Sequence, residues 1–319
     1  MQAVRWHSMG AVKQAAKRSK WLVCAATVLD DRRAQLAARH GAAASTSGST
    51  HASFSLDESL AYIDTVFGDY VRYGELGEED LRGSKVLELG PGDNLGVALR
   101  FLEAGADSVV ALDKFASVRD REQQEQIYAE LDPSGLRHDP ERLRVMEGLA
   151  VEEAAALDEQ FDLIVSRAVL EHLYDLDAAF AAMDQLLRAG GTMLHKVDFR
   201  DHGMFTDGGM HPLTFLSIPD GVYRLMSRNS GRPNRHLVDW YRAKLARLGY
   251  ETRFLVTHAV AAADEIVPHQ EGWAPEPGRD DAAIELVRSI RARLPSRYAQ
   301  LSDADLATSG VFIVAHKPA

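Results

Sequence analysis

The sequence predicts an α/β fold, in which a seven-stranded, mostly parallel sheet carries helices on both faces. Short apolar runs, typical of strands buried on both faces, alternate with amphipathic segments along most of the chain. The first such run, 86–89, leads into the glycine-containing segment 90–96, and a helical pattern follows it. Strand, glycine turn and helix in this order are typical of the opening βαβ unit of a nucleotide-binding sheet.

The expected strands are runs rich in Val, Ile, Leu or Phe that are bounded by turn residues. They comprise residues 86–89, 108–113, 143–146, 161–166, 192–197, 252–256 and 311–315. A Ser-x-x-Glu capping box at Ser55 and Glu58 predicts an amphipathic helix before the first strand. The alternation of strands and helices supports one domain over residues 55–319.

Residues 1–40 carry eight Lys or Arg and two Asp or Glu, which predicts a basic helical extension. We expect this helix to pack on the core or to pair with a second subunit as a homo-oligomer. A basic anchor for a membrane-associated or acidic partner is the alternative. The apolar run 21–29 is too short to span a bilayer, which takes roughly 20 residues, and no leader cleavage site follows it. Residues 41–54 are small and polar and indicate a flexible linker.

The net charge of −11 argues against a nucleic-acid partner, because binding to phosphates requires basic residues. The single cysteine, Cys24, excludes an internal disulfide framework and a cysteine-based zinc site. It is typical of a cytoplasmic protein, which is the localisation we expect.

The glycine segment argues against a dinucleotide. In the G-x-G-x-x-G pattern a third glycine lets the helix approach a pyrophosphate, but here Gly96 comes one residue late. Glu88 adds a negative charge that a phosphate would disfavour, whereas Glu88 or Asp93 could hold a ligand ammonium group. Asp113, at the end of the second strand, is placed to accept hydrogen bonds from ribose hydroxyls. Together these features predict a ligand that combines adenosine with an amino acid.

Four segments, in order, resemble the motifs of S-adenosylmethionine-dependent methyltransferases with the Rossmann-like fold. They are ELGPG (Glu88–Gly92), Asp113, FDLIVSRAVLEHL (Phe161–Leu173) and LLRAGGTML (Leu186–Leu194). Asn94 stands where many relatives have a third glycine, and Ala189 replaces the usual proline before Gly190. HKVDFRDHGMF and LTFLSIPDGVYRLM further resemble a bacterial subgroup associated with polysaccharide or secondary-metabolite assembly.

The resemblance implies S-adenosyl-L-methionine as the cofactor and assigns its contacts. The residues that it places at the methionine part, the ribose, the adenine and the following turn are Glu88, Gly90, Gly92, Asp113, Leu149, Ala150, Ser166 and His172. For the pair Glu171 and His172, a helix-start cap is an equally open interpretation.

Methyl transfer to an alcohol also needs a base for the leaving proton. Residues 195–205 follow the fifth strand and concentrate ionisable groups at the ligand-binding edge of the sheet. We expect His202 or His195 to be the base, with Asp198 or Asp201 orienting or charging it. The alternative is a surface loop of unrelated charges. A metal held by Asp198, Asp201, His202 and His211 is a minority hypothesis, and we expect no metal site.

An insertion of about 50 residues, 202–250, lies between the fifth and sixth strands. We expect it to form a lid and to bind the acceptor, a small molecule, through the polar group Arg228, Asn229, Asn234 and Arg235. A solubilising loop is the alternative.

The sequence therefore predicts O-methylation of a hydroxyl on a sugar, a glycoside or another polyhydroxylated small molecule. N- or C-methylation of a metabolite is the nearest alternative, and a non-catalytic S-adenosylmethionine-binding relative is another. A hydride-transferring dehydrogenase is disfavoured by Glu88 and by the displaced third glycine.

Overall fold

The structure is a computed structural model of the chain. It describes residues 18–39, 44–45, 51–117, 120–132, 134–260, 262, 264–271 and 279–319. The first part of the predicted basic extension, 1–17, and most of the predicted linker therefore lie outside the described residues.

The contacts divide the chain into two compact units, which are described separately. The strand unit comprises residues 43–197, 244–254 and 312–319, and the insertion unit comprises residues 1–42, 198–243 and 255–311.

The helices of the described residues are α2 (Lys20–Arg39), α3 (Leu56–Gly74), α4 (Glu78–Leu81), α5 (Gly96–Glu103), α6 (Arg121–Leu131), α7 (Leu176–Leu186), α8 (Asp220–Ser227), α9 (Val238–Leu248), α10 (Arg279–Arg291), α11 (Ser296–Ala299) and α12 (Asp303–Ala307). The strands are β1 (Ala44–Ser45), β2 (Lys85–Leu89), β3 (Ser108–Asp113), β4 (Ala116–Ser117), β5 (Leu143–Glu147), β6 (Phe161–Arg167), β7 (Leu187–Asp198), β8 (Glu251–Ala259), β9 (Gln270–Glu271) and β10 (Thr308–His316). Short 3₁₀ helices are η1 (His51–Ser53), η2 (Leu136–His138), η3 (Val151–Leu157), η4 (Leu170–His172), η5 (Thr206–Gly208) and η6 (Thr214–Ser217).

The main sheet has the strand order β5-β3-β2-β6-β7-β10-β8-β9. In the strand unit, β5, β3, β2, β6 and β7 pair in parallel. The register aligns Leu89 of β2 with Leu112 of β3 and with Ser166 of β6, and it aligns Ser166 with His195 of β7. The carboxyl ends of these strands therefore lie at one edge of the sheet, where α/β folds place their ligands.

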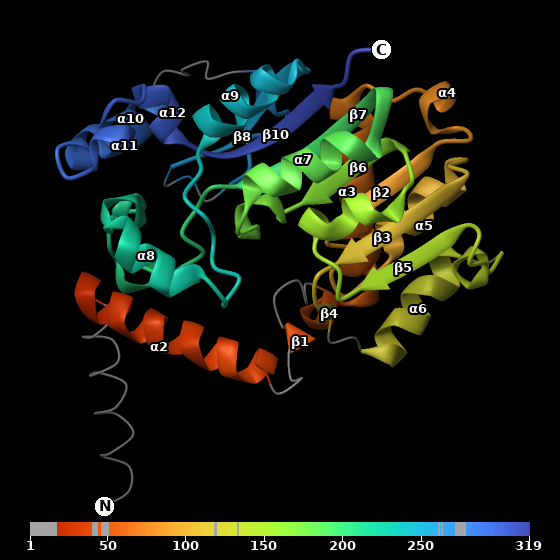
Figure 1. Ribbon diagram of the computed structural model, residues 1–319, viewed down its shortest axis with the longest axis horizontal. Helices are drawn as coiled ribbons and strands as arrows, with labels where there is room; N and C mark the ends of the chain where they lie inside the picture. Colours follow the sequence, from red (N-terminus) through yellow and green to blue (C-terminus); the bar gives the residue numbers. More distant parts are fainter. Residues whose placement is uncertain are drawn as a thin grey trace, which may run out of the picture. The chain divides into compact units, whose positions relative to one another are not determined.

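Helices cover both faces of these parallel strands (Figure 1). α3, α5 and α6 contact one another and form one layer, whereas α7 contacts η3 and belongs to the other. The core side chains between the layers include Phe101, Phe161 and Phe180, each essentially unexposed. These layers confirm the predicted Rossmann-like α/β fold with helices on both faces.

The strand count differs from the prediction. All seven expected strands are present, and the main sheet gains an eighth, β9, which pairs antiparallel with β8. β9 has two residues, Gln270 and Glu271, with no apolar run, so its sequence carried no strand signal. β1, which lies in the predicted linker, pairs in parallel with β4, and the two form a separate two-stranded sheet.

The insertion unit contains α2, which contacts α8. Val23, Cys24 and Thr27 are buried on one side of α2, and Asp31 accepts hydrogen bonds from the backbone N and from Nδ2 of Asn229, both at 2.7 Å. Among the described helices, none is long and apolar enough to cross a membrane.

The predicted capping box at the start of α3 is confirmed. Ser55 Oγ accepts from Glu58 N at 3.3 Å, and the Glu58 carboxylate accepts from Ser55 N at 2.8 Å. Each bond satisfies a backbone amide that a helix start leaves without a partner. The cap sets the point from which α3 runs toward β2.

We predict that Ser55→Ala lowers the free energy of unfolding by about 1 kcal/mol, because it removes one of the two reciprocal bonds. Chemical denaturation measures the change. Thr65→Ala, also on α3 but within the helix, is the matched control, since its hydroxyl bonds only to Ala61 O. An equal effect of the two substitutions would contradict the cap.

Candidate active site

A tight turn after β2 forms the first part of the candidate site. Gly90 and Gly92 have φ values of 65° and 71°, in the left-handed region that residues with a Cβ rarely adopt. A Cβ added at Gly90 would lie 2.5 Å from Val169 Cγ2. Gly90 is therefore required both by its backbone angle and by its close approach to the segment after β6.

Glu88, two residues before Gly90, holds a carboxyl group inside the strand unit. The residue is buried, and Oε2 has no hydrogen-bond partner among the described residues. Burial raises the pKa of Glu88 to about 8, because a carboxylate loses the stabilisation that water gives its charge. A cationic ligand group that reached Oε2 would supply both a partner and a compensating charge.

Asp113 ends β3 beside the glycine turn. Gly90 N donates to Leu112 O at 2.8 Å, which fixes the turn against the end of β3. Asp113 Oδ1 accepts from Phe115 N at 2.9 Å, so the orientation of the carboxylate is set by its own loop. Asp113 lies at the end of β3, the edge of the sheet where its sequence position predicted an acidic residue.

The segment after β5 lies against the same edge. Gly148 N donates to Asp113 O at 2.9 Å, and Leu149 and Ala150 follow directly, with Ala150 buried at the start of η3. The hydrogen bond of Gly148 therefore holds Leu149 and Ala150, the two residues expected beside an adenine ring, near the end of β3.

The carboxylate of Asp93 binds backbone amides, a structural role that its sequence position did not indicate. Its carboxylate oxygens accept from His51 N at 3.4 Å and from Ala52 N at 3.2 Å. Of the two carboxylates considered for a ligand ammonium, Asp93 thus already has backbone donors, which leaves Glu88 as the better candidate.

Ser166 and His195 form a buried pair on neighbouring strands. Ser166 Oγ lies 2.7 Å from His195 Nδ1, both residues are fully buried, and His195 Nε2 has no partner among the described residues. Burial lowers the pKa of His195 to about 3, so the imidazole is neutral at physiological pH. A base must meet an acceptor that enters from solvent, so this burial disfavours His195 for that role.

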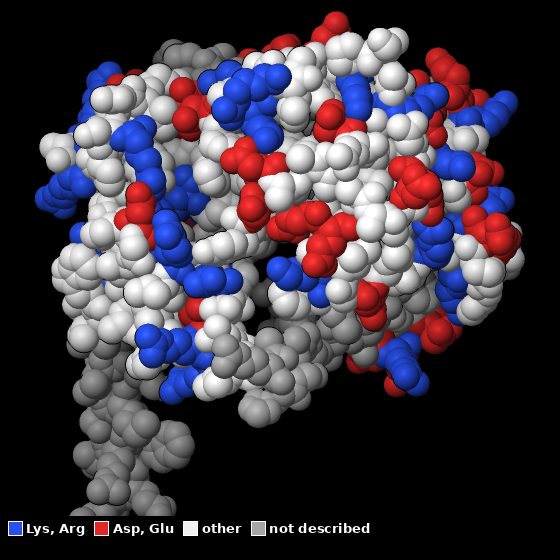
Figure 2. Space-filling model, viewed as in Figure 1, with Lys and Arg blue, Asp and Glu red and all other residues white. Residues whose placement is uncertain are grey.

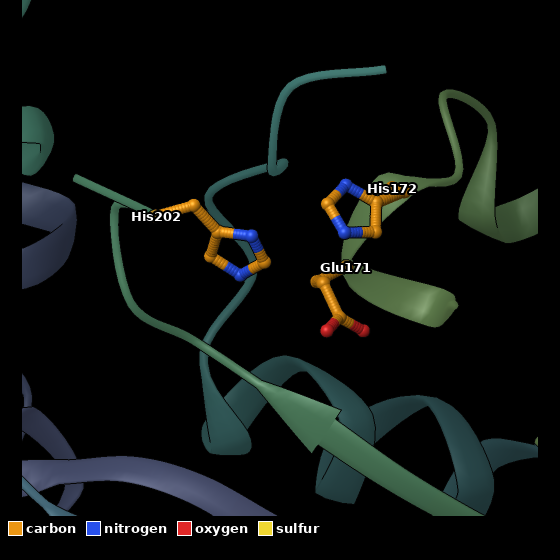
Figure 3. A group of neighbouring side chains, drawn as sticks. All are labelled: Glu171, His172 and His202. Atoms are coloured by element: carbon orange, nitrogen blue, oxygen red, sulfur yellow. The ribbon is translucent and has the colours of Figure 1, made fainter. Parts of the chain in front are cut away.

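Glu171 and His172 lie on η4, after β6, and Figure 3 shows their side chains on this turn, with His202 drawn on the loop after β7. The structure argues against a helix-start cap at this pair. The following helix, α7, is capped by Asp175, whose Oδ1 accepts from Ala178 N at 3.0 Å. Glu171 is buried and His172 half-buried.

A cluster of charges at the ends of β6 and β7 was not predicted from the sequence. Asp69 of α3 forms ion pairs with Arg167 at 2.8 Å and with Lys196 at 3.3 Å. All three side chains are largely buried. The cluster ties α3 to the carboxyl ends of both strands. No local pattern could reveal it, because Asp69 lies 98 residues from Arg167 and 127 residues from Lys196 in the sequence.

The insertion unit contains a pocket of about 520 Å³ that begins where β7 ends. Its apolar lining includes Phe199, Leu213, Phe215, Leu237 and Leu306. Its polar lining includes Asp198, Arg200, His202, Asp207 and Ser309. Ser309 is buried, and its Oγ has no partner among the described residues. A pocket with both kinds of lining suits a small molecule with hydroxyl groups and apolar faces.

His202 stands out in this pocket because of its backbone and its neighbour. Its φ of 49° is unusual for a residue other than glycine, and Nε2 lies 3.8 Å from Asp198 Oδ2. Burial lowers the pKa of His202, and the nearby Asp198 charge offsets only part of this effect. The imidazole is therefore neutral, and able to accept a proton, at physiological pH.

Asp198 and Asp201, both expected to assist the base, differ in their partners. Burial would raise the pKa of Asp198, but its hydrogen bonds from Arg200, at 2.6 to 3.0 Å, outweigh burial and hold the pKa below its usual value. Asp201 accepts from the backbone N of Gly203, Phe205 and Thr206 and from Thr206 Oγ1. Asp198 is thus the partner of His202, whereas Asp201 shapes the loop.

The four residues of the minority metal hypothesis do not form a ligand set. The nitrogens of His211 bond to Leu286 O at 3.0 Å and to Leu213 N at 3.1 Å, and the Asp201 oxygens hold the loop amides. Within either unit taken by itself, no three potential ligand atoms of the described residues lie within 4.8 Å of one another.

The expected acceptor-binding side chains of the insertion do not line the pocket. Arg235 bonds to Phe215 O and Ile218 O and stacks on Tyr223, with its guanidinium carbon 4.2 Å from the ring centroid. Asn229 bonds to Asp31. Asn234 caps the backbone of its own loop, and Arg228 lies in a separate groove. The insertion does line the pocket, but with other residues.

A methyltransferase domain model matches residues 65–247, more than half of the chain. No curated protein sequence matches the chain. The fold is similar to that of a putative S-adenosylmethionine-dependent methyltransferase from Listeria monocytogenes, with 15% identity, a TM-score of 0.43, and coverage of 79% of this chain and 98% of that one. It is also similar to an S-adenosylmethionine-dependent methyltransferase from Mesorhizobium loti, with 16% identity, a TM-score of 0.42, and coverage of 82% and 100%. These similarities in fold say nothing about the methyl acceptor.

The chain belongs to the methyltransferase domain family. It is an S-adenosylmethionine-dependent methyltransferase with the Rossmann-like fold, as the sequence motifs indicated. The strand unit fits the cofactor, because Glu88 offers a buried carboxyl oxygen without a partner beside a turn that no Cβ could occupy at Gly90.

We predict that cofactor binding releases a proton from Glu88. The pKa of about 8 keeps the free carboxyl largely protonated at pH 7, and a cationic ligand binds its ionised form. Affinity should therefore rise by up to about tenfold per pH unit as the pH approaches 8, until the ammonium group of the ligand itself loses its proton. Calorimetry in two buffers of different ionisation enthalpy measures the released proton.

Glu88→Gln should remove both the proton release and the pH dependence. Glu78→Gln, at an exposed carboxylate of the strand unit, is the matched control and should change neither. Identical binding heats in the two buffers at pH 7 for the unmodified protein would contradict the prediction.

Proposed function

We propose that the protein transfers the methyl group of S-adenosylmethionine to a hydroxyl oxygen of a sugar, a glycoside or another polyhydroxylated small molecule. The observation that carries this proposal is the pocket of the insertion unit, where a neutral His202 lies beside Asp198 and the lining combines apolar rings with polar groups. Hydroxyl acceptors need a base, and sugars present both apolar faces and hydroxyl groups.

The proposed cofactor contacts lie in the strand unit. Glu88 would bind the ammonium group of the methionine part, the backbone at Gly90 and Gly92 would allow its close approach, and Asp113 would accept from the ribose hydroxyls. Leu149 and Ala150 would flank the adenine. Ser166 and His172 complete the proposed cofactor residues, and Ser166 also bonds to His195. The cofactor, when bound, supplies an activated methyl group on a sulfonium.

The chain has two tasks in this reaction, which are to align the acceptor and to accept its proton. His202 would take the hydroxyl proton on its imidazole, and Asp198 would stabilise the resulting imidazolium. Ser309 Oγ, which lines the pocket without a partner among the described residues, would bond to another hydroxyl of the acceptor. Phe199 and Phe215 would pack against its apolar face.

In the direct test, the protein is incubated with methyl-labelled S-adenosylmethionine and a panel of sugars, glycosides, amines and compounds with an acidic C–H group. The products are identified by mass spectrometry. Methyl ethers of hydroxyl compounds support the proposal. Methylated amines or carbons without methyl ethers would overturn the O-methylation proposal but not the family.

We predict that His202→Asn lowers kcat by a factor on the order of 10² or more, with little change in the Kd of the cofactor. Asparagine tolerates a positive φ better than most residues, so this substitution removes the base and spares the backbone. His138→Ala, at an exposed histidine of the strand unit, is the control.

The pH profile separates a base from a structural role. Because the pKa of His202 lies below 6.5, kcat should be constant above that pH and should fall as the pH drops through the lowered pKa. His202→Asn should abolish this acidic limb. An unchanged pH profile in the variant would exclude His202 as the base.

A further inference from the structure

Helix α2 exposes three leucines on one side. Leu22, Leu29 and Leu36 are each 53–58% exposed, and their spacing of seven residues puts them on one face of the helix. The opposite side, with Val23, Cys24 and Thr27, is buried. Burial on α8 therefore accounts for only one of the two apolar sides of α2.

Helix α8 extends this apolar face. Leu225 of α8 is 54% exposed, and it lines a groove of about 390 Å³ together with Leu36, Arg32 and Arg228. We call Leu22, Leu29, Leu36, Leu225, Arg32 and Arg228 the basic–apolar surface. Exposed leucines on two contacting helices are more than the single scattered apolar residues that normal surfaces carry.

The charge beside these leucines is positive. Arg32, Arg33 and Arg228 are exposed, and only Arg33 is paired, with Asp30 at 3.0 Å. In the described part of the chain, no carboxylate forms an ion pair with Arg32 or Arg228. Figure 2 shows Lys and Arg side chains over α8 and α2. The groove also includes the Asp31 carboxylate, which is bonded to Asn229. The surface therefore combines exposed leucines with the guanidinium groups of Arg32 and Arg228, which form no ion pair in the described part of the chain.

A second copy of the chain is a poor occupant for this surface. A two-fold pairing of α2 would bring the same arginine-bearing faces together, and like charges that face each other destabilise an interface. An anionic lipid surface complements both features. When such a helix lies in the plane of the membrane, its leucines enter the boundary between headgroups and acyl chains, and its arginines extend to the phosphates.

We infer that the basic–apolar surface binds the protein peripherally to membranes that contain anionic lipids. The surface lies on the membrane and does not span it, in keeping with the finding that no described helix could cross a bilayer. The binding depends on the insertion unit and is independent of the identity of the methyl acceptor.

The test is co-sedimentation of the full chain with vesicles of phosphatidylcholine alone or of phosphatidylcholine with phosphatidylglycerol. We expect binding to the anionic vesicles that weakens with added salt. Leu22→Ser with Leu29→Ser should reduce the partition coefficient by about tenfold or more, because two apolar side chains lose their insertion. Arg32→Gln with Arg228→Gln should reduce it about fivefold or more per charge and weaken the salt dependence.

Val145→Ser and Arg82→Gln, at exposed residues of the strand unit, are the matched controls and should leave binding unchanged. Circular dichroism should show that all variants fold, since every substituted side chain is exposed. Three outcomes would overturn the inference. They are no binding to anionic vesicles, binding that the leucine and arginine variants retain in full, and a concentration-dependent dimer in light scattering that the leucine variants abolish.

Discussion

The candidate cofactor site depends on one steric constraint, the close approach of Gly90 to Val169. β2 and β6 are neighbours in the sheet, and the chain leaves them through Gly90 (φ 65°) and Ala168 (φ 54°), both left-handed. At Ala168 this conformation costs roughly 1–2 kcal/mol, whereas glycine adopts it freely. The two turns can contact only because Gly90 lacks a Cβ. At Gly90 the chain therefore presents backbone alone, at the edge of the sheet that carries the proposed cofactor residues.

Two buried ionisable groups of the strand unit that lack an ion-pair partner among the described residues, Glu88 and His195, are uncharged near pH 7. The same cause, burial, raises the pKa of Glu88 to about 8 and lowers that of His195 to about 3. Both groups are therefore neutral near pH 7, and neither carries an isolated charge into the core. A neutral carboxyl that ionises when a cation binds favours a cationic ligand over an anionic one. The structure thus supplies a physical reason for a ligand that bears an ammonium group.

Much of the strand unit could be predicted from sequence, because its signals are local. Apolar runs set the strands, the capping box set the start of α3, and Glu88, Gly90 and Asp113 lie within a few residues of a strand end. Contacts between distant segments had no such signal. The ion pairs of Asp69 with Arg167 and Lys196 follow from the packing of α3, which periodicity alone does not give.

The roles of side chains in the insertion were harder to predict from the sequence, for a different reason. Much of its backbone lies outside long helices and strands, so side chains must satisfy its amides and carbonyls. Asp201 accepts from three backbone N–H groups, and Arg235 donates to two carbonyls. A concentration of Arg, Asn and Asp in such a segment can therefore serve its folding first. Arg235 and Asn229, which were expected to bind the acceptor, bond instead to the protein and do not line the pocket. The pocket is lined both by side chains that bond to this backbone, such as Asp201, and by Ser309, whose Oγ has no partner among the described residues.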